Sequence, residues 1–209
     1  MTPQKRIKID VFTDYVCPWC YLSSANIEKL KQHYPVDIRW VPFPLHPETP
    51  EAGLSLQELF QGRNMDEMQQ RLRNLMQEAG LDYSDRSMTY NSRLAQELGK
   101  WADTQAGGDR IHSALYRAYF VAGKNLADKD VLVSIAESVG LDADTARKVL
   151  DERSFSDQVD ADWQRARQYQ ISGVPSFVAS NYMMTGCQPY PELEKFVQFV
   201  AEKAATETG

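Results

Sequence analysis

The chain has 209 residues, of which 43% are hydrophobic, and a formal net charge of −6. This length and apolar content suffice for a sizeable core without metals or structural disulfides. The acidic balance argues against nucleic acid as a partner, and no apolar run approaches the roughly 20 residues that span a bilayer. Residues 1–10 are charged and lack the apolar stretch of a secretory signal, so we expect a cytoplasmic protein with no membrane partner.

The chain contains three cysteines, Cys17, Cys20 and Cys187. An odd number cannot form a fully paired framework, and a C-x-x-C pair in a reducing compartment is more often catalytic or metal-binding than structural. A zinc site would need two further ligands. The three histidines are scattered along the chain and no second C-x-x-C follows. We therefore expect no metal and interpret the pair as catalytic.

The first elements in chain order are a strand, a helix and a second strand. Residues 7–12 alternate between apolar and polar, residues 18–32 have helical spacing, and residues 36–41 again have the pattern of a strand. Pro18 suits the first helical position, where its missing N–H is no loss. Cys17 is therefore predicted at the N-cap, facing free backbone N–H groups. Such a β-α-β unit favours parallel strands.

Residues 42–50 contain four prolines and are predicted to form an irregular connector. Helical patterns then dominate up to residue 170. We expect helices from residue 55 and at 65–80, 91–105, 111–121, 128–140, 144–150 and 155–169. After Gly173, residues 175–179 and 182–185 predict a hairpin, and residues 191–203 predict a last helix.

The resulting order is β-α-β, a block of helices, and β-β-α. This order predicts an α/β protein with a thioredoxin fold and a large all-helical insertion. We divide the chain accordingly into a thioredoxin-like domain, residues 1–52 with 171–209, and a helical insertion domain, residues 53–170.

The C-x-x-C motif is Cys17-Pro18-Trp19-Cys20. The thiolate is the attacking species in disulfide exchange, and a helix N-terminus carries about half a positive charge that favours an anion there. Cys17, expected to be exposed at the helix entrance, is therefore the predicted nucleophile. Cys20, one turn on, is predicted to attack the mixed disulfide and resolve it. Pro18 stiffens the turn, and Trp19 offers a substrate an apolar contact surface.

A second signal is Gly173-Val174-Pro175, between a helix and a strand. The X-Pro bond is compatible with either isomer and is usually trans. In thioredoxin folds, however, the proline at this place is cis and faces the cysteine pair. We expect the same here, with the backbone of Val174 turned outward to pair with a substrate.

Two further residues have two interpretations each. Asp14 either caps the strand-to-helix loop or relays protons to Cys20. Cys187 is either a small buried apolar residue or a third thiol near the pair that can be trapped or oxidised. An aromatic set at helical spacing is predicted to be a packing face: His112, Tyr116, Tyr119 and Phe120.

The chain resembles the DsbA family of thioredoxin-fold proteins and, within it, the FrnE-like branch. The matching segments are residues 14–21, 40–43, 115–120, 171–177 and 186–189. The resemblance implies a thioredoxin fold with a helical insertion, redox roles for Cys17 and Cys20, and a cis bond before Pro175. Two positions depart from the branch. Cys187 stands where members usually have a small residue, and Gln96 where many have histidine.

The same resemblance implies two alternatives to disulfide exchange. Related proteins include glutathione-dependent 2-hydroxychromene-2-carboxylate isomerases and kappa-class glutathione transferases, typically with serine at the nucleophile position. Cys17 favours redox chemistry here, on protein or small-molecule thiols and disulfides. We expect no cofactor, with glutathione as a candidate thiol co-substrate, and a monomer or a dimer. A chaperone-like peptide-binding module is the non-catalytic alternative, motivated by Trp19.

Overall fold

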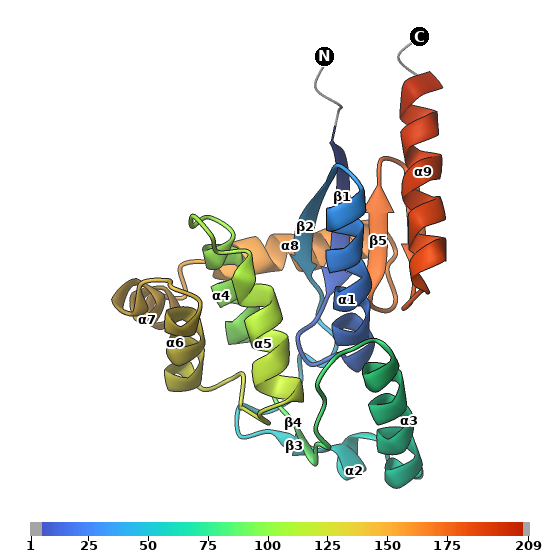
Figure 1. The fold of residues 1–209 in the computed structure, drawn as a ribbon. Helices are drawn as coiled ribbons and strands as arrows, with labels where there is room; N and C mark the ends of the chain where they lie inside the picture. Colours follow the sequence, from blue (N-terminus) through green and yellow to red (C-terminus); the bar gives the residue numbers. More distant parts are fainter. Residues whose placement is uncertain (1–5, 207–209) are drawn as a thin grey trace.

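A four-stranded mixed sheet forms the centre of the computed structural model, which describes residues 6–206 (Figure 1). Its order is β2-β1-β5-β6, from β1 (Ile7–Thr13), β2 (Val36–Pro42), β5 (Ser176–Ala179) and β6 (Tyr182–Thr185). β1 is parallel to β2 and antiparallel to β5, as the predicted β-α-β and hairpin require. Residues 1–5, half of the stretch behind the cytoplasmic expectation, lie outside the described residues.

Helices cover both faces of this sheet. α1 (Pro18–His33) and α9 (Tyr190–Thr206) bury their apolar sides with Ile9 and Val11 of β1 on one face. On the other face, Phe12 packs with Ala166 of α8 (Ser156–Gln168). Figure 1 shows α8 running behind the strands, on the side opposite α1. Successive strand residues point to opposite faces, so covering both sides explains why β1 is buried from Ile9 onwards.

The predicted helices between β2 and β5 are all present. They are α2 (Leu56–Leu59), α3 (Met65–Glu78), α4 (Arg93–Ala102), α5 (Arg110–Phe120), α6 (Lys129–Ser138), α7 (Ala143–Glu152) and α8. The expectation of an all-helical insertion is wrong in one detail, because β3 (Leu54–Ser55) pairs with β4 (Met88–Thr89). Two-residue strands are too short to produce an alternating pattern, so no pattern in the sequence predicted them. Within residues 6–206, no helix combines the length and apolarity needed to cross a membrane.

Side-chain caps set where several of these helices begin. Ser55 accepts a hydrogen bond from the Glu58 N–H while the Glu58 carboxylate accepts one from the Ser55 N–H, a reciprocal capping box. Asn64 caps α3 and Asp128 caps α6 through their side-chain oxygens. Gly80 follows α3 with a φ of +70°, a left-handed value that glycine adopts without strain.

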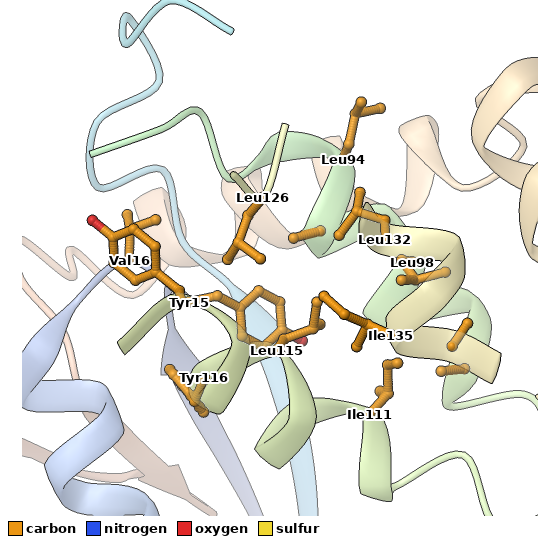
Figure 2. Packing of buried hydrophobic residues seen from close by; sticks show 14 of the residues in the cluster. Tyr15, Val16, Leu94, Leu98, Ile111, Leu115, Tyr116, Leu126, Leu132 and Ile135 are labelled. Carbon is orange, nitrogen blue, oxygen red and sulfur yellow. The ribbon is translucent and has the colours of Figure 1, made fainter. Parts of the chain in front are cut away.

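The helical block shares a core with the segment that carries the cysteines. Its apolar cluster includes Tyr15, Val16, Cys17, Cys20 and Tyr21 together with residues of α4 to α7. Figure 2 shows Tyr15 and Val16 beside helix residues such as Leu115 and Tyr116. The division into residues 1–52 with 171–209 and residues 53–170 stays a prediction. α8, which it assigns to the insertion, packs against the sheet.

Candidate active site at the cysteine pair

Cys17 is the N-cap of α1, as predicted. Its carbonyl oxygen accepts hydrogen bonds from the N–H groups of Cys20 and Tyr21, both at 3.1 Å, and Pro18 follows as the first helical residue. The Cys17 side chain makes no capping hydrogen bond of its own. The sulfur therefore lies at a helix N-terminus, where a thiolate is electrostatically favoured.

The prediction that Cys17 is exposed is wrong, because the residue is only 3% exposed. It belongs to the core that the helical block forms around the motif, and the insertion therefore covers the helix entrance. Cys17 instead lines a cavity of about 520 Å³ between the motif and residues of the insertion. A partner sulfur can approach Cys17 through this cavity.

The Val174–Pro175 bond is cis, as expected for this fold. The Cys17 thiol donates a hydrogen bond to the Val174 carbonyl oxygen, at 3.6 Å between sulfur and oxygen. Val174 lines the same cavity, while Pro175 is buried and its carbonyl accepts a hydrogen bond from the Gly186 N–H at 2.8 Å. Cys17 and Val174, which are 157 positions apart in the chain, are thus in contact through the Cys17 sulfur.

Cys20 lies deeper than Cys17 and is 1% exposed. Burial raises the pKa of its thiol well above the usual value, and the hydrogen bond with Cys17 and the charge of Cys17 add to this. Hydrogen bonds from the Thr13 hydroxyl and the Asp14 N–H act in the opposite direction on the pKa. The three cysteines form no disulfide in this structure. The raised pKa therefore keeps the Cys20 thiol protonated at neutral pH.

An aromatic layer closes the site below Cys20. Tyr116 is fully buried, its hydroxyl is hydrogen-bonded to Thr13 Oγ1, and burial raises its pKa well above the usual value. Its ring stacks near Tyr21, with centroids 5.7 Å apart. The predicted packing face is confirmed, because four residues of α5 are buried: His112, Tyr116, Tyr119 and Phe120. The hydrogen bond of Thr13 with Cys20 and the electrostatic effect of Cys20 on Tyr116 were not anticipated from the sequence.

Asp14 caps the loop between β1 and α1. Its carboxylate accepts hydrogen bonds from the N–H groups of Val16, at 3.1 Å, and Leu45, at 3.2 Å. The Ser92 hydroxyl and the Gln96 amide, at 3.0 and 3.1 Å, also donate to it. Burial raises the pKa of this carboxyl to about 6, although these hydrogen bonds lower it. The contact with Cys20 comes from the Asp14 backbone N–H, which supports the capping interpretation.

Gln96 extends this network to α8. Its amide NH₂ donates to Asp14 and to the Phe43 carbonyl oxygen, while its carbonyl oxygen accepts a hydrogen bond from Trp163 Nε1 at 2.9 Å. Gln96 thus fixes Asp14 from the helical block, at the position where the resemblance implied a histidine in many members of the branch. A histidine has too few nitrogens to make all these bonds at once.

Cys187 is half-buried, whereas Cys17 and Cys20 are buried, and its two interpretations stay predictions. It follows Gly186, whose φ of +88° ends β6 in a turn that leaves the next residue partly in solvent. Burial raises the pKa of its thiol, which also receives a hydrogen bond from Ser23 and senses the charge of Cys17. A third thiol near the pair is thus present.

The cavity wall opposite the motif comes from the helical insertion. Trp19, 38% exposed, lies at its edge, where a substrate could contact it. Three arginines line the wall, Arg63, Arg71 and Arg86. They were not identified from the sequence, because they are separated along the chain and belong to no motif. Within residues 6–206, no three His, Cys, Asp or Glu side chains gather closely enough to hold a metal ion.

Comparison with known proteins identifies similarity along nearly the whole chain. A family model described as "DSBA-like thioredoxin domain" matches residues 8–198. The Bacillus subtilis protein YwbO is 26% identical over 197 residues, which are 91% of this chain and 96% of YwbO.

Solved structures agree with this match. A probable DsbA oxidoreductase from Streptomyces coelicolor superposes with a TM-score of 0.86 at 26% identity, covering 93% of this chain and 90% of the other. A 2-hydroxychromene-2-carboxylate isomerase superposes with a TM-score of 0.75 at 18% identity, covering 97% and 100%, a similarity of fold alone. The predicted thioredoxin fold and the predicted resemblance are confirmed.

Proposed function

Because the chain belongs to the DsbA-like thioredoxin domain family, we propose that it is a thiol–disulfide oxidoreductase that works through Cys17 and Cys20. The observation that carries the proposal is the position of Cys17. Its sulfur lies at the start of α1, contacts the Val174 carbonyl beside Pro175, borders an open cavity and has Cys20 behind it. The similar Streptomyces coelicolor protein, described as an oxidoreductase, supports this function.

The reaction proceeds in two exchanges. The Cys17 thiolate attacks one sulfur of a substrate disulfide, forms a mixed disulfide and releases the first substrate thiolate. Cys20 loses its proton to solvent and attacks the Cys17 sulfur, which forms the Cys17–Cys20 disulfide and releases the second thiolate. The substrate gains two electrons and the pair loses two, and the reverse sequence oxidises a dithiol substrate.

The surroundings of Cys20 suit the second exchange. Its raised pKa keeps Cys20 protonated while Cys17 makes the first attack. When the proton leaves, the Thr13 hydroxyl and the Asp14 N–H donate hydrogen bonds to the new thiolate. Ordered use of the two thiols follows from this difference in burial and charge.

The test is reduction of insulin in the presence of dithiothreitol, with the precipitation of the insulin B chain as the readout. Cys17→Ser should remove catalysis completely. Cys187→Ser is the matched control, because it deletes a neighbouring thiol without altering the pair, and it should retain activity. Equal activity of wild type and Cys17→Ser would overturn the proposal.

The alternatives stay predictions. The isomerase shares the fold at 18% identity, and no feature of the cavity favours its reaction over disulfide exchange. A chaperone-like role would leave activity toward unfolded clients intact in Cys17→Ser, which separates it from disulfide exchange.

A further inference from the structure

The cavity beside Cys17 has the size of a small-molecule site. Its volume of about 520 Å³ lies within the range of roughly 300–1,000 Å³ that small ligands occupy. Cys17 and Val174 lie on one side, and apolar side chains such as Leu56, Phe60 and Leu72 form much of the other. A bound molecule would therefore lie against the reactive sulfur, between the motif and the helical insertion, with part of its surface open to solvent.

Three arginines on this cavity have no carboxylate partner. Among residues 6–206, no salt bridge within 4.0 Å joins Arg63, Arg71 or Arg86 to an acidic group. Most other arginines of the chain are paired with a carboxylate: Arg39, Arg73, Arg93, Arg117, Arg147, Arg153 and Arg165. Although the chain has a net charge of −6, these three unpaired arginines line the same cavity as the Cys17 sulfur.

Each of these arginines is held over an aromatic ring instead. The guanidinium of Arg71 lies 6.0 Å from the ring centre of Trp19, and that of Arg63 lies 6.0 Å from Phe60. Arg86 lies 4.7 Å from the Tyr119 ring centre. A ring contact uses none of the guanidinium N–H donors as a hydrogen bond to a carboxylate would, and these donors match a carboxylate in a bidentate pair.

Arg86 is the most confined of the three. Its Nη1 donates a hydrogen bond to the Tyr119 hydroxyl at 2.6 Å, while its Nε is buried without a hydrogen-bond partner. A buried donor left unpaired is costly, and an incoming oxyanion could satisfy it. Glu67 is the acidic side chain that lines this cavity, and His46, also on the wall, lies 3.7 Å from Glu48. The wall is thus positive in sum.

We propose that the cavity binds a low-molecular-weight disulfide that carries carboxylate groups, and that Arg86 and Arg71 hold these groups while a substrate sulfur meets Cys17. The inference rests on the oxidoreductase function proposed above and names its substrate class. The cavity volume of about 520 Å³ matches a small molecule rather than a longer stretch of protein chain. The reaction is the two-step exchange already given, in which the bound disulfide is reduced to two thiols.

The experiment compares three disulfides as oxidants of the reduced protein. They are 3,3′-dithiodipropionate with two carboxylates, 2-hydroxyethyl disulfide without charge, and cystamine with two ammonium groups. Each second-order rate constant, measured at low ionic strength, is divided by that of free dithiothreitol with the same disulfide. This division removes the intrinsic reactivity of each compound.

The normalised rate should be at least about tenfold higher for dithiodipropionate than for the neutral disulfide, and lowest for cystamine. Arg86→Gln and Arg71→Gln should each lower the anionic-to-neutral ratio about tenfold. Arg71 is exposed, so its variant should fold even if Arg86→Gln does not. Arg147→Gln is the matched control and should leave the anionic-to-neutral ratio unchanged, because Arg147 is paired with Asp130 on the surface of the helical block.

Equal normalised rates for the three disulfides, or a ratio unaltered in both cavity variants, would overturn the proposal. A disulfide-linked acidic peptide that reacts faster than dithiodipropionate with the same arginine dependence would overturn the small-molecule assignment. Failure of the oxidoreductase function is distinguishable, because no disulfide would then react faster than with Cys17→Ser. Titration calorimetry of Cys17→Ser with the unreactive 3,3′-thiodipropionate then tests the anion site alone, with binding expected and its loss expected in Arg86→Gln.

Discussion

The two sides of the cysteine pair are built differently. We call the residues under Cys20, namely Thr13, Asp14 and Tyr116, the buried side, and Trp19, Arg71 and Arg86 around the cavity the cavity side. The residues of the buried side are at most 3% exposed, and burial raises the pKa values of Cys20, Asp14 and Tyr116. The cavity side contains unpaired cations and apolar surface.

This difference separates two tasks. Burial on the first side decides when the Cys20 thiol is charged, because desolvation disfavours ionised groups. Open volume and arginines on the cavity side decide which molecule reaches Cys17. Both sides depend on the helical insertion, which supplies Tyr116 from α5 to one and Arg71 from α3 to the other.

The largest expected contrast between the two sides is in stability. Tyr116→Ala removes a fully buried ring from the buried side and should lower the free energy of unfolding by roughly 3–5 kcal/mol. Trp19→Ala on the cavity side should cost less than about 1 kcal/mol, because Trp19 is 38% exposed. Urea unfolding monitored by circular dichroism measures both. Similar losses for the two variants would contradict the distinction between the sides.

The next contrast is in the pH dependence of stability. Burial raises the pKa of Asp14 from 3.8 to about 6, so the folded protein binds a proton that the unfolded chain has released between these pH values. The contribution of Asp14 to the free energy of unfolding should therefore be largest below about pH 4. It should decline by roughly 3 kcal/mol as the pH rises to about 6.

Urea unfolding of wild type and Asp14→Asn from pH 4 to 7 tests this contribution. The difference in unfolding free energy between the two proteins should change most between about pH 4 and 6 and level off by about pH 7. A difference that is independent of pH would show that the Asp14 carboxyl titrates alike in the folded and unfolded chains.

Thiol reactivity should differ between Cys17 and Cys20. Because Cys20 is deeper and its pKa is raised, iodoacetamide at pH 8 should label Cys17 at least about tenfold faster than Cys20 in the reduced protein. Peptide mass spectrometry gives both rates. The urea-unfolded chain is the control, in which the two rates should converge. Faster labelling of Cys20 in the folded protein would reverse the assigned roles.

The smallest expected effect concerns one hydroxyl group. Tyr116→Phe removes the hydrogen bond between the Tyr116 hydroxyl and Thr13 Oγ1 while keeping the ring, and should cost about 1 kcal/mol of stability. Tyr182→Phe is the matched control, since Tyr182 lies at the other end of the sheet and is half-buried. A loss for Tyr116→Phe no larger than for Tyr182→Phe would show that this bond contributes nothing.

The sequence by itself determined the local parts of this protein. Alternation over residues 7–12, Pro18 at the first helical position and Asp128 as an N-cap depend on neighbours within a few residues, so their patterns predict strands and helices directly. Local patterns also predict that the cysteine motif lies at the start of a helix. These features were enough to predict the fold and the position of the reactive pair.

Only the tertiary structure decided how that pair is surrounded. Burial of Cys17, the bonds from Gln96 to Asp14, and the meeting of Arg71 and Arg86 at one cavity join residues from distant segments. No pattern of short period encodes such contacts, because they depend on how the insertion packs over the sheet. The local sequence therefore specified the reactive groups, while long-range packing specified their protonation and their access.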